Sequence, residues 1–238
     1  MSERPADAKN FDFNDPLAGL TEDHFQGVPA EIVQKAKVSC LSVSKNIKYN
    51  GDLNKTIVLW DRESPYHEVQ QTRLSAFYAA AISQKIDWMG AKSLERLLTS
   101  CFLKDLGMMK LPALIRGKSP ARMTPQETTL FQQHPREGVN FLLQFSALEE
   151  AVRQVVYQHH ECADGSGFPN GLSRVKIYPL AKVAALADFF ATRLIDDRIS
   201  PLDVLKRFMS DRTVITKFDP DIVRSLVKVF IKTGDSKK

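Results

Sequence analysis

The stretch His159-His-Glu-Cys-Ala-Asp-Gly-Ser-Gly-Phe-Pro169 sets two adjacent histidines and a glutamate directly before a glycine-rich loop. The preceding residues, 148–160, carry valines on one side at helical spacing, so we expect a helix that ends at the histidine pair. Residues 163–171 are rich in turn formers and predict a loop. A single histidine at a helix end usually caps the helix or packs in the core. Two histidines before such a loop are better explained by a metal or ligand site.

Helical patterns cover most of the chain on either side of this stretch. Apolar residues recur at spacings of three and four, and helix starts are marked by the capping box Thr124-Pro-Gln-Glu127, by Ser200-Pro-Leu-Asp203 and by Asp219-Pro220. The expected helices span residues 29–45, 66–86, 93–106, 124–133, 134–145, 148–160 and 179–194, with two more beginning near 200 and 219. The sequence therefore predicts an all-α fold, a helical bundle with one glycine-rich loop.

The region before residue 63 has a different character. Residues 1–27 contain prolines and glycines without periodicity, which predicts a partly flexible lead-in. Residues 56–60, Thr-Ile-Val-Leu-Trp, have the composition of a β-strand. We therefore expect two parts: an N-terminal region over residues 1–62, with α/β structure as one option, and a helical domain over residues 63–238.

The composition indicates a globular protein with one substantial core. Of 238 residues 43% are hydrophobic, and the formal net charge of +5 is too small an excess to indicate nucleic-acid binding. Cys40, Cys101 and Cys162 form no CxxC pair and are expected to be free thiols. The sequence carries neither a secretory or transit signal nor an apolar run of about 18 residues, which predicts a cytoplasmic protein without a membrane span.

Two aspartates lie within apolar helical stretches. Asp105 follows Leu98 and Cys101 at helical intervals, and Asp188 lies among alanines in residues 180–191. A buried carboxylate needs a cation, a metal ion or several hydrogen-bond donors. Taken singly, each aspartate is explained better by structural ion pairs or hydrogen bonds than by metal binding, because such pairs also occupy buried positions. The alanines around Asp188 predict that another element approaches this helix closely.

The stretch 159–169 resembles the HHExxDGxGYP signature of the HD-GYP family, with Phe168 in place of the tyrosine. Other segments resemble the family in the same order. They are Lys104-Asp-Leu-Gly107 for the HD segment, Leu111-Pro112, Met123-Thr-Pro-Gln-Glu127, His134-Pro-Arg-Glu-Gly138, Asp188 of the later V-A-D helix and Phe218-Asp-Pro220. The resemblance covers about residues 66–233. It implies a helical bundle that holds two or three metal ions, usually iron or manganese, and hydrolyses cyclic di-GMP.

The resemblance implies metal ligands at Asp105, His134, His159, His160 and Asp188. Four further groups of the family pattern are replaced in this chain. The histidine of the HD pair is Lys104, the first-helix histidine is Gln70, a glutamate sometimes found four residues earlier is Tyr66, and the lysine after the HD segment is Met108. Of the four ligands that the family uses for the metal of the HD pocket, two survive.

We infer that Lys104 replaces this first metal ion. Two carboxylates without a histidine make a poor site for iron or manganese. An ammonium group in the pocket repels a divalent ion and can pair with Asp105 and Asp188 instead. The second site keeps one carboxylate and three imidazoles, so we expect at most one divalent ion, iron or manganese, or none. Asp105 and Lys104 are the candidate catalytic residues, since a lysine can neutralise a phosphate oxygen.

The loop supplies the candidate ligand-binding residues. They are Gly165, Ser166, Gly167, Phe168 and Pro169, together with Arg198. The glycines allow tight turns and close backbone approach. Arg198 is displaced from the basic segment that helps the family hold phosphate, and the second basic residue of that segment is absent, which weakens the prediction of phosphate binding. The alternative is a rigid surface loop kept for folding or for contact with a partner.

These observations favour a degenerate HD-GYP-like domain in cyclic di-GMP signalling. Hydrolysis is expected to be weak or absent, with the domain acting as a nucleotide sensor or protein-interaction module. The resemblance implies cyclic di-GMP or its linear product as the ligand and a GGDEF-type protein as a partner. The alternative is an active metal-dependent cyclic di-GMP phosphodiesterase that uses the surviving metal site. A scaffold that binds no nucleotide is the third option, and neither a nucleic acid nor a membrane is expected as a partner.

Overall fold

The structure is a computed structural model that describes residues 11–48 and 52–231. Every regular element in these ranges is a helix, and no β-strand is present among them. In chain order they are η1 (Glu22–Phe25), α1 (Ala30–Lys48), α2 (Asp52–Glu63), α3 (Tyr66–Ser83), α4 (Ala91–Leu103), η2 (Leu106–Lys110), η3 (Pro120–Arg122), α5 (Pro125–Phe131), α6 (His134–Leu142), α7 (Glu150–Gln158), η4 (Arg174–Lys176), α8 (Pro179–Asp197), α9 (Pro201–Ser210), α10 (Arg212–Ile215) and α11 (Pro220–Val229). The predicted all-α fold is confirmed. None of the helices in these ranges is long and apolar enough to cross a lipid bilayer.

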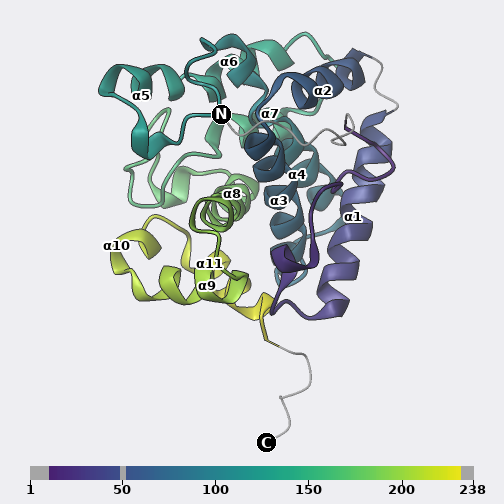
Figure 1. The fold of residues 1–238 in the computed structure, drawn as a ribbon, viewed down its shortest axis with the longest axis vertical. Helices are drawn as coiled ribbons and strands as arrows, with labels where there is room; N and C mark the ends of the chain where they lie inside the picture. The colour runs from purple at the N-terminus through teal and green to yellow at the C-terminus, as the bar shows by residue number, and fades with distance from the viewer. Residues whose placement is uncertain (1–10, 49–51, 232–238) are drawn as a thin grey trace, which may run out of the picture.

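The bundle is built around α3 and α8, which pack against each other at its centre (Figure 1). Both helices are rich in buried alanines, among them Ala76 and Ala80 of α3 and Ala184 and Ala187 of α8. Side chains this short let two helix backbones come close together. The close approach predicted at the alanines around Asp188 is therefore that of α3.

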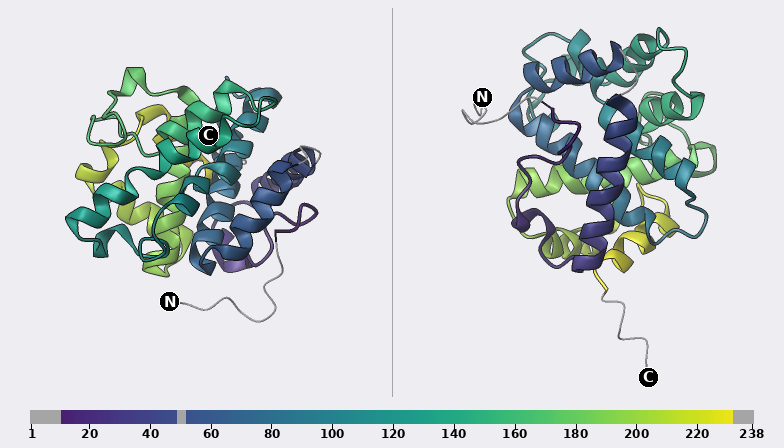
Figure 2. Two further views of the ribbon diagram at one scale, coloured as in Figure 1. Left: turned by 90° about the horizontal axis from the view of Figure 1, so that it is seen from above. Right: turned by 90° about the vertical axis from the view of Figure 1, so that its right-hand side faces the viewer.

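The N-terminal helices lie on one side of this bundle. α1 packs against α3 and α4, as the turned views show (Figure 2). The predicted strand at residues 56–60 is wrong, because this segment belongs to α2. Leu53, Ile57 and Trp60 are buried at spacings of four and three, which is the period of a helix. The β-branched composition suggested a strand, but the apolar spacing over the longer segment favours a helix, so the described part of this region is helical rather than α/β.

Residues 11–27, predicted as flexible chain, are packed onto the helices. Phe11 and Phe25 are only 8% and 3% exposed. The ring of Phe25 lies 4.3 Å from that of Phe77, and the ring of Phe11 lies 5.6 Å from that of Phe102. Single aromatic anchors of this kind leave no periodic pattern in the sequence, which is why periodicity did not reveal them. The apolar core runs from this segment into the helical bundle.

A buried ion pair joins α2 to α3. Arg73 Nη2 lies 2.8 Å from Asp61 Oδ1, and the two side chains are 6% and 2% exposed. The other terminal nitrogen of Arg73, Nη1, donates to the carbonyl oxygen of Ala18, and the guanidinium lies over the ring of Phe11 at 5.9 Å from its centroid. Arg73 thus ties the N-terminal segment, α2 and α3 together.

We expect Asp61→Ala to lower the free energy of unfolding by about 3–5 kcal/mol, because it leaves the Arg73 guanidinium buried without its counter-ion. Urea denaturation followed by circular dichroism measures this loss. The matched control is Asp52→Ala in the same helix, which breaks an exposed pair with Lys55 and should leave the urea midpoint almost unchanged. Equal effects of the two substitutions would contradict the role assigned to the buried pair.

Candidate metal centre

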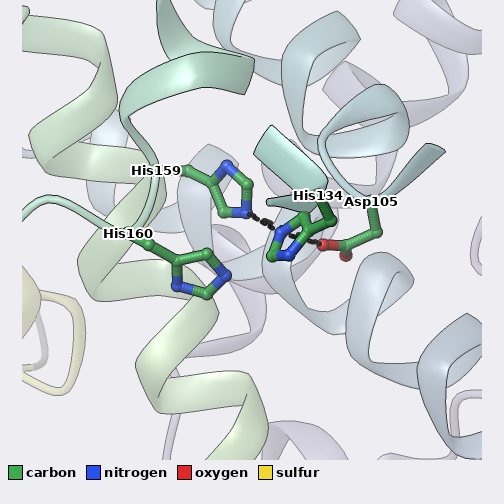
Figure 3. Close-up of side chains that lie close together, drawn as sticks. All are labelled: Asp105, His134, His159 and His160. Atoms are coloured by element: carbon green, nitrogen blue, oxygen red, sulfur yellow. Dashed lines mark hydrogen bonds and ion pairs between the residues drawn. The ribbon is translucent and has the colours of Figure 1, made fainter. Parts of the chain in front are cut away.

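Four of the five predicted metal ligands meet in the structure. Asp105, His134, His159 and His160 each offer one ligand atom, and these atoms lie within 4.8 Å of one another (Figure 3). Asp105 precedes η2, His134 begins α6, and the two adjacent histidines follow α7. A carboxylate and three imidazoles at this separation form a donor set suited to a divalent transition metal.

Close packing of η2 on α6 brings Asp105 to His134. A Cβ atom on Gly107 would lie 2.0 Å from the carbonyl oxygen of His134 and 2.5 Å from the amide nitrogen of Gly138, so only glycine fits there. Gly138 is itself tight, since a Cβ atom would lie 3.2 Å from Val156 Cγ1 of α7. The two glycines let η2, α6 and α7 lie close together, and with them the ligands that they carry.

Backbone carbonyl groups orient two of the imidazoles. His134 Nδ1 lies 2.8 Å from the carbonyl oxygen of Phe131, and His159 Nδ1 lies 2.7 Å from that of Val156. Since a carbonyl oxygen can only accept, each Nδ1 carries the proton and each Nε2 keeps a lone pair in the neutral ring. The two Nε2 atoms are 3.2 Å apart, and each is 3.7 Å from Asp105 Oδ1. Three acceptors thus converge on one point, an arrangement that a bound cation satisfies.

The electrostatics of the group keep these ligands in the state that binds metal. Burial and the neighbouring His159 lower the pKa of His134 to about 3, and burial also holds the pKa of His160 well below its ordinary value. Both imidazoles are therefore neutral at neutral pH. Burial would raise the pKa of Asp105, but the Lys104 ammonium holds it far below the usual range. The charged carboxylate of Asp105 and the neutral imidazoles beside it are in the protonation states that bind a divalent ion.

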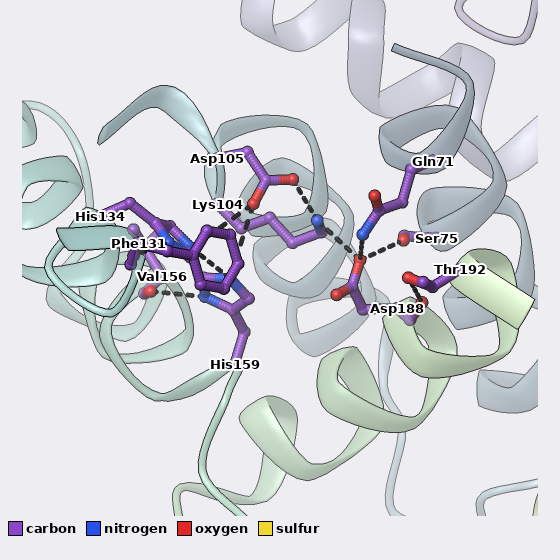
Figure 4. A network of polar contacts seen from close by, with 10 residues as sticks. All are labelled: Gln71, Ser75, Lys104, Asp105, Phe131, His134, Val156, His159, Asp188 and Thr192. Carbon is purple, nitrogen blue, oxygen red and sulfur yellow. Dashed lines mark hydrogen bonds and ion pairs between the residues drawn. The ribbon is translucent and has the colours of Figure 1, made fainter. Parts of the chain in front are cut away.

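Lys104 occupies the other side of Asp105 (Figure 4). Its side chain is completely buried, and Nζ forms ion pairs with Asp105 Oδ2 and, at 2.7 Å, with Asp188 Oδ1. Burial opposes the charge, yet the two carboxylates raise the pKa of Lys104 above its ordinary value. The lysine is therefore protonated. Asp105 is shared, with Oδ1 toward the histidines and Oδ2 toward the ammonium.

Asp188 lies outside the group of four, although the family resemblance implies it as a ligand. Its Oδ1 accepts hydrogen bonds from Gln71 Nε2 at 3.0 Å and from Ser75 Oγ at 2.8 Å, besides the ion pair with Lys104. The family pattern pointed to Gln70 on this helix, but the residue that the structure places at Asp188 is Gln71. Gln71 and Ser75 are one turn apart on α3, and this helical spacing is the signal that could have found both.

Glu68 is a further polar residue of α3 that the sequence did not single out. It lies one turn before Gln71. Its Oε1 accepts a hydrogen bond from the amide of Gly117. Its Oε2 is buried without a hydrogen-bond partner among the described residues. Burial, opposed by the Gly117 bond and aided by nearby Asp105, raises the pKa of Glu68 to about 7. The Gly117 bond fastens the loop between η2 and η3 to the start of α3. Met108, in place of the family's lysine, is buried in η2.

The glycine-rich loop folds back on the end of α7. Glu161 is buried and accepts hydrogen bonds from the amides of Asn170 at 2.8 Å and Leu172 at 2.7 Å. The sequence placed Glu161 in the motif without giving it a role, and the structure makes it the inner brace of the loop. Gly165 and Gly171 have φ values of 81° and 62°, the left-handed region that favours glycine.

The predicted ligand-binding residues are not all brought to the cluster. Ser166 bonds within the loop, where its amide and hydroxyl donate to Asp164 Oδ1 at 2.9 and 2.6 Å. Phe168, whose peptide bond to Pro169 is cis, stacks on His160 with ring centroids 4.5 Å apart. Arg198 is exposed at the end of α8, about 15 Å along the helix from Asp188. The loop therefore adjoins the cluster and Arg198 does not.

Comparisons with known proteins agree with this geometry. A model of the family described as HD domain matches residues 62–201. Cyclic di-GMP phosphodiesterase PA4108 of Pseudomonas aeruginosa is 32% identical over 133 residues, which cover 53% of this chain and 30% of that protein. The 3'3'-cGAMP-specific phosphodiesterase 2 of Vibrio cholerae is 27% identical over 201 residues, 80% of this chain and 36% of that protein. The chain spans about a third of the length of these relatives.

The fold has a solved counterpart. Bd1817, an HDG"Y"P protein from Bdellovibrio bacteriovorus, superposes with a TM-score of 0.59 at 19% sequence identity, covering 87% of this chain and 75% of the other. At this identity the likeness concerns the fold alone. Together with the family match and the motif at residues 159–169, it confirms the resemblance to HD-GYP proteins, and the chain belongs to the HD domain family.

Proposed function

We propose that this domain binds one divalent metal ion at Asp105, His134, His159 and His160, and that it acts in cyclic dinucleotide signalling as a nucleotide sensor or protein-interaction module with little or no hydrolysis. The observation that carries the proposal is the Lys104 ammonium between Asp105 and Asp188. The relatives are named as phosphodiesterases of cyclic di-GMP or 3'3'-cGAMP, which supports a cyclic dinucleotide as the ligand class.

A buried ammonium works against a second metal ion. Two unit charges 4 Å apart interact by about 4 kcal/mol at an effective dielectric constant of 20, and a divalent ion doubles the repulsion. Lys104 also uses the carboxylate oxygens that a metal ion in this pocket would need, since Asp105 Oδ2 and Asp188 Oδ1 both pair with Nζ. We therefore assign the position next to the histidine cluster to the lysine, so that the site holds one built-in cation and room for one metal ion.

One metal ion supports phosphodiester hydrolysis less well than two. A bound divalent ion polarises a phosphate oxygen and lowers the pKa of a bound water, and a two-metal site stabilises both the attacking and the leaving oxygen. Lys104 does not substitute for the missing half, because its ammonium is completely buried and already paired with two carboxylates. This arrangement favours binding of the nucleotide over its turnover.

The alternative function is an active metal-dependent phosphodiesterase that uses the surviving site. It is favoured by the intact group of one carboxylate and three imidazoles, and by relatives that all carry the name phosphodiesterase. A GGDEF-type protein partner and a cytoplasmic location stay predictions from the sequence. The experiments below separate the sensor from the enzyme.

Turnover, measured together with metal content, distinguishes the two functions. We expect the purified protein, reconstituted with Mn²⁺, to hold one ion per chain by elemental analysis, and to bind cyclic di-GMP in calorimetry without measurable turnover. His159→Ala should sharply weaken metal binding, whereas His24→Ala, which removes an imidazole that bonds Thr21 beside η1, should leave it intact. Measurable hydrolysis with one ion per chain would establish the enzyme instead, and two ions per chain would contradict the replacement of the first metal ion by Lys104.

Replacement of the lysine tests the electrostatic argument directly. We expect Lys104→His combined with Gln71→His to raise the Mn²⁺ content from one ion toward two and to increase cyclic di-GMP hydrolysis at least about tenfold, since one charge-stabilising group in an active site is commonly worth about 10²–10³ in kcat. The matched control is Lys118→His, which removes a lysine paired with Glu127. Unchanged metal content in the double variant would show that pocket shape, not the ammonium, excludes the second ion.

The metal-free protein should become less stable as the pH falls. Because the folded-state pKa of His134 is about 3, the folded protein binds fewer protons than the unfolded chain below the ordinary value of 6.5. The stabilisation is therefore present above pH 6.5 and is lost as the pH falls toward 3, by up to about 1.4 kcal/mol per pH unit. Urea denaturation in chelator at pH 7 and 5 measures this slope. It should become shallower in His134→Gln and stay unchanged in His24→Gln.

A further inference from the structure

We propose that Phe168 is a positioning residue of the metal centre, which holds the imidazole of His160 in its metal-binding orientation by stacking on it. This inference rests on the proposed metal site and assigns a role to the glycine-rich loop besides ligand contact. The rings of Phe168 and His160 are 4.5 Å apart between centroids and inclined by only 24°. No other aromatic pair around the cluster is stacked in this way within the described residues.

His160 needs such support because it lacks the bond that orients its neighbours. The Nδ1 atoms of His134 and His159 are each held by a backbone carbonyl, at 2.8 and 2.7 Å. No hydrogen bond to the imidazole of His160 is found among the residues that the structure describes. Metal-binding histidines usually rely on a partner of this kind to set the ring orientation. For His160 the flat contact with Phe168 takes that place, with Phe131 farther off at 5.7 Å.

The glycine-rich loop follows His160 and turns back, so that Phe168 lies against this histidine. The amide of Phe168 donates to the carbonyl oxygen of His160 at 3.1 Å, which closes the loop onto the end of α7. Gly167 makes this return feasible, because a Cβ atom there would lie 2.2 Å from the amide nitrogen of Cys162 and 2.4 Å from the His160 carbonyl oxygen. The hydrogen bond from the amide of Asn170 to the carboxylate of Glu161 holds the other end of the loop. A backbone bond and a ring contact therefore join Phe168 to one metal ligand.

The expected size of the effect follows from the ring contact. Aromatic pairs contribute about 0.5–1.5 kcal/mol beyond the area that they bury, which corresponds to about a 2- to 12-fold change in an equilibrium constant. We expect Phe168→Ala to weaken Mn²⁺ binding to the full chain by about this factor in calorimetry. Phe168→Tyr, which keeps the ring, should bind Mn²⁺ as the unchanged protein does. Phe145→Ala is the matched control, since it removes a half-buried ring that contacts only Phe141 among the described aromatic residues.

A double-mutant cycle separates positioning from general stability. If Phe168 acts through His160, then Phe168→Ala should have no further effect on Mn²⁺ affinity in a His160→Ala background. An equal loss in both backgrounds would overturn the inference and assign Phe168 a structural role, and so would wild-type affinity in Phe168→Ala. Should Phe168→Ala fail to fold, Phe168→Leu keeps much of the volume without the flat ring and carries the same comparison.

The two proposals fail in different ways. Absence of Mn²⁺ binding by the unchanged protein would overturn the proposed metal site itself. Normal binding by the unchanged protein with no dependence on Phe168 would overturn only the positioning role. The electron paramagnetic resonance spectrum of bound Mn²⁺ adds a readout that loss of stability does not move, because it should change in Phe168→Ala in the same direction as in His160→Ala, and not in Phe145→Ala.

Discussion

A lysine side chain with no exposure to solvent must be neutralised where it lies, and the core of this protein is arranged around that requirement. The ammonium of Lys104 lies between Asp105 and Asp188, which come from different parts of the chain. Breaking such a buried pair leaves an unpaired charge, which is far more costly than the pair itself. Gln71 and Ser75 of α3 complete the shell around Asp188. The charge group thus connects α3, the end of α4 and α8 at the centre of the bundle.

The same charge group divides the site into two unlike halves. Asp105 presents one oxygen to the lysine and the other to His134 and His159, so a single carboxylate serves both the built-in cation and the proposed metal site. On the histidine side the acceptors converge without protons between them. On the lysine side, Asp105 Oδ2 and Asp188 Oδ1 are both paired with Lys104 Nζ. This asymmetry is the reason that we propose, for a member of the HD domain family, a function different from that named for its relatives.

The glycine-rich loop contacts the candidate metal centre in the structure as well as adjoining it in sequence. Glu161 braces it from inside, Gly167 lets it pass close to the backbone of the preceding turn, and Phe168 returns to stack on His160. A ligand or partner that moved this loop would also move one of the three imidazoles. Such a connection is what a sensor requires, since occupancy of one place must change the energetics of another.

The sequence by itself determined the elements that depend on local chemistry. The capping box at Thr124 starts α5, Pro179 starts α8, and the apolar spacing predicts the helices between them, because caps and periodicity act over a few residues. Of the five ligands that the family resemblance implies, Asp105, His134, His159 and His160 meet, whereas Asp188 lies outside the group. The pairing of Lys104 with both aspartates was inferred from the family resemblance together with charge, and it is present.

Only the tertiary structure decided which side chains meet between elements. The rotation of α3 against α8 places Gln71 rather than Gln70 at Asp188, and a shift of one residue turns a helix by about 100°. Residues 11–27 lack any periodic signal, yet their aromatic rings are buried because the bundle offers places for them. Residues 56–60 have strand composition but lie in a helix, because burial of Leu53, Ile57 and Trp60 against the bundle outweighs intrinsic propensity. Packing energies act over the whole core, and no local stretch of sequence contains them.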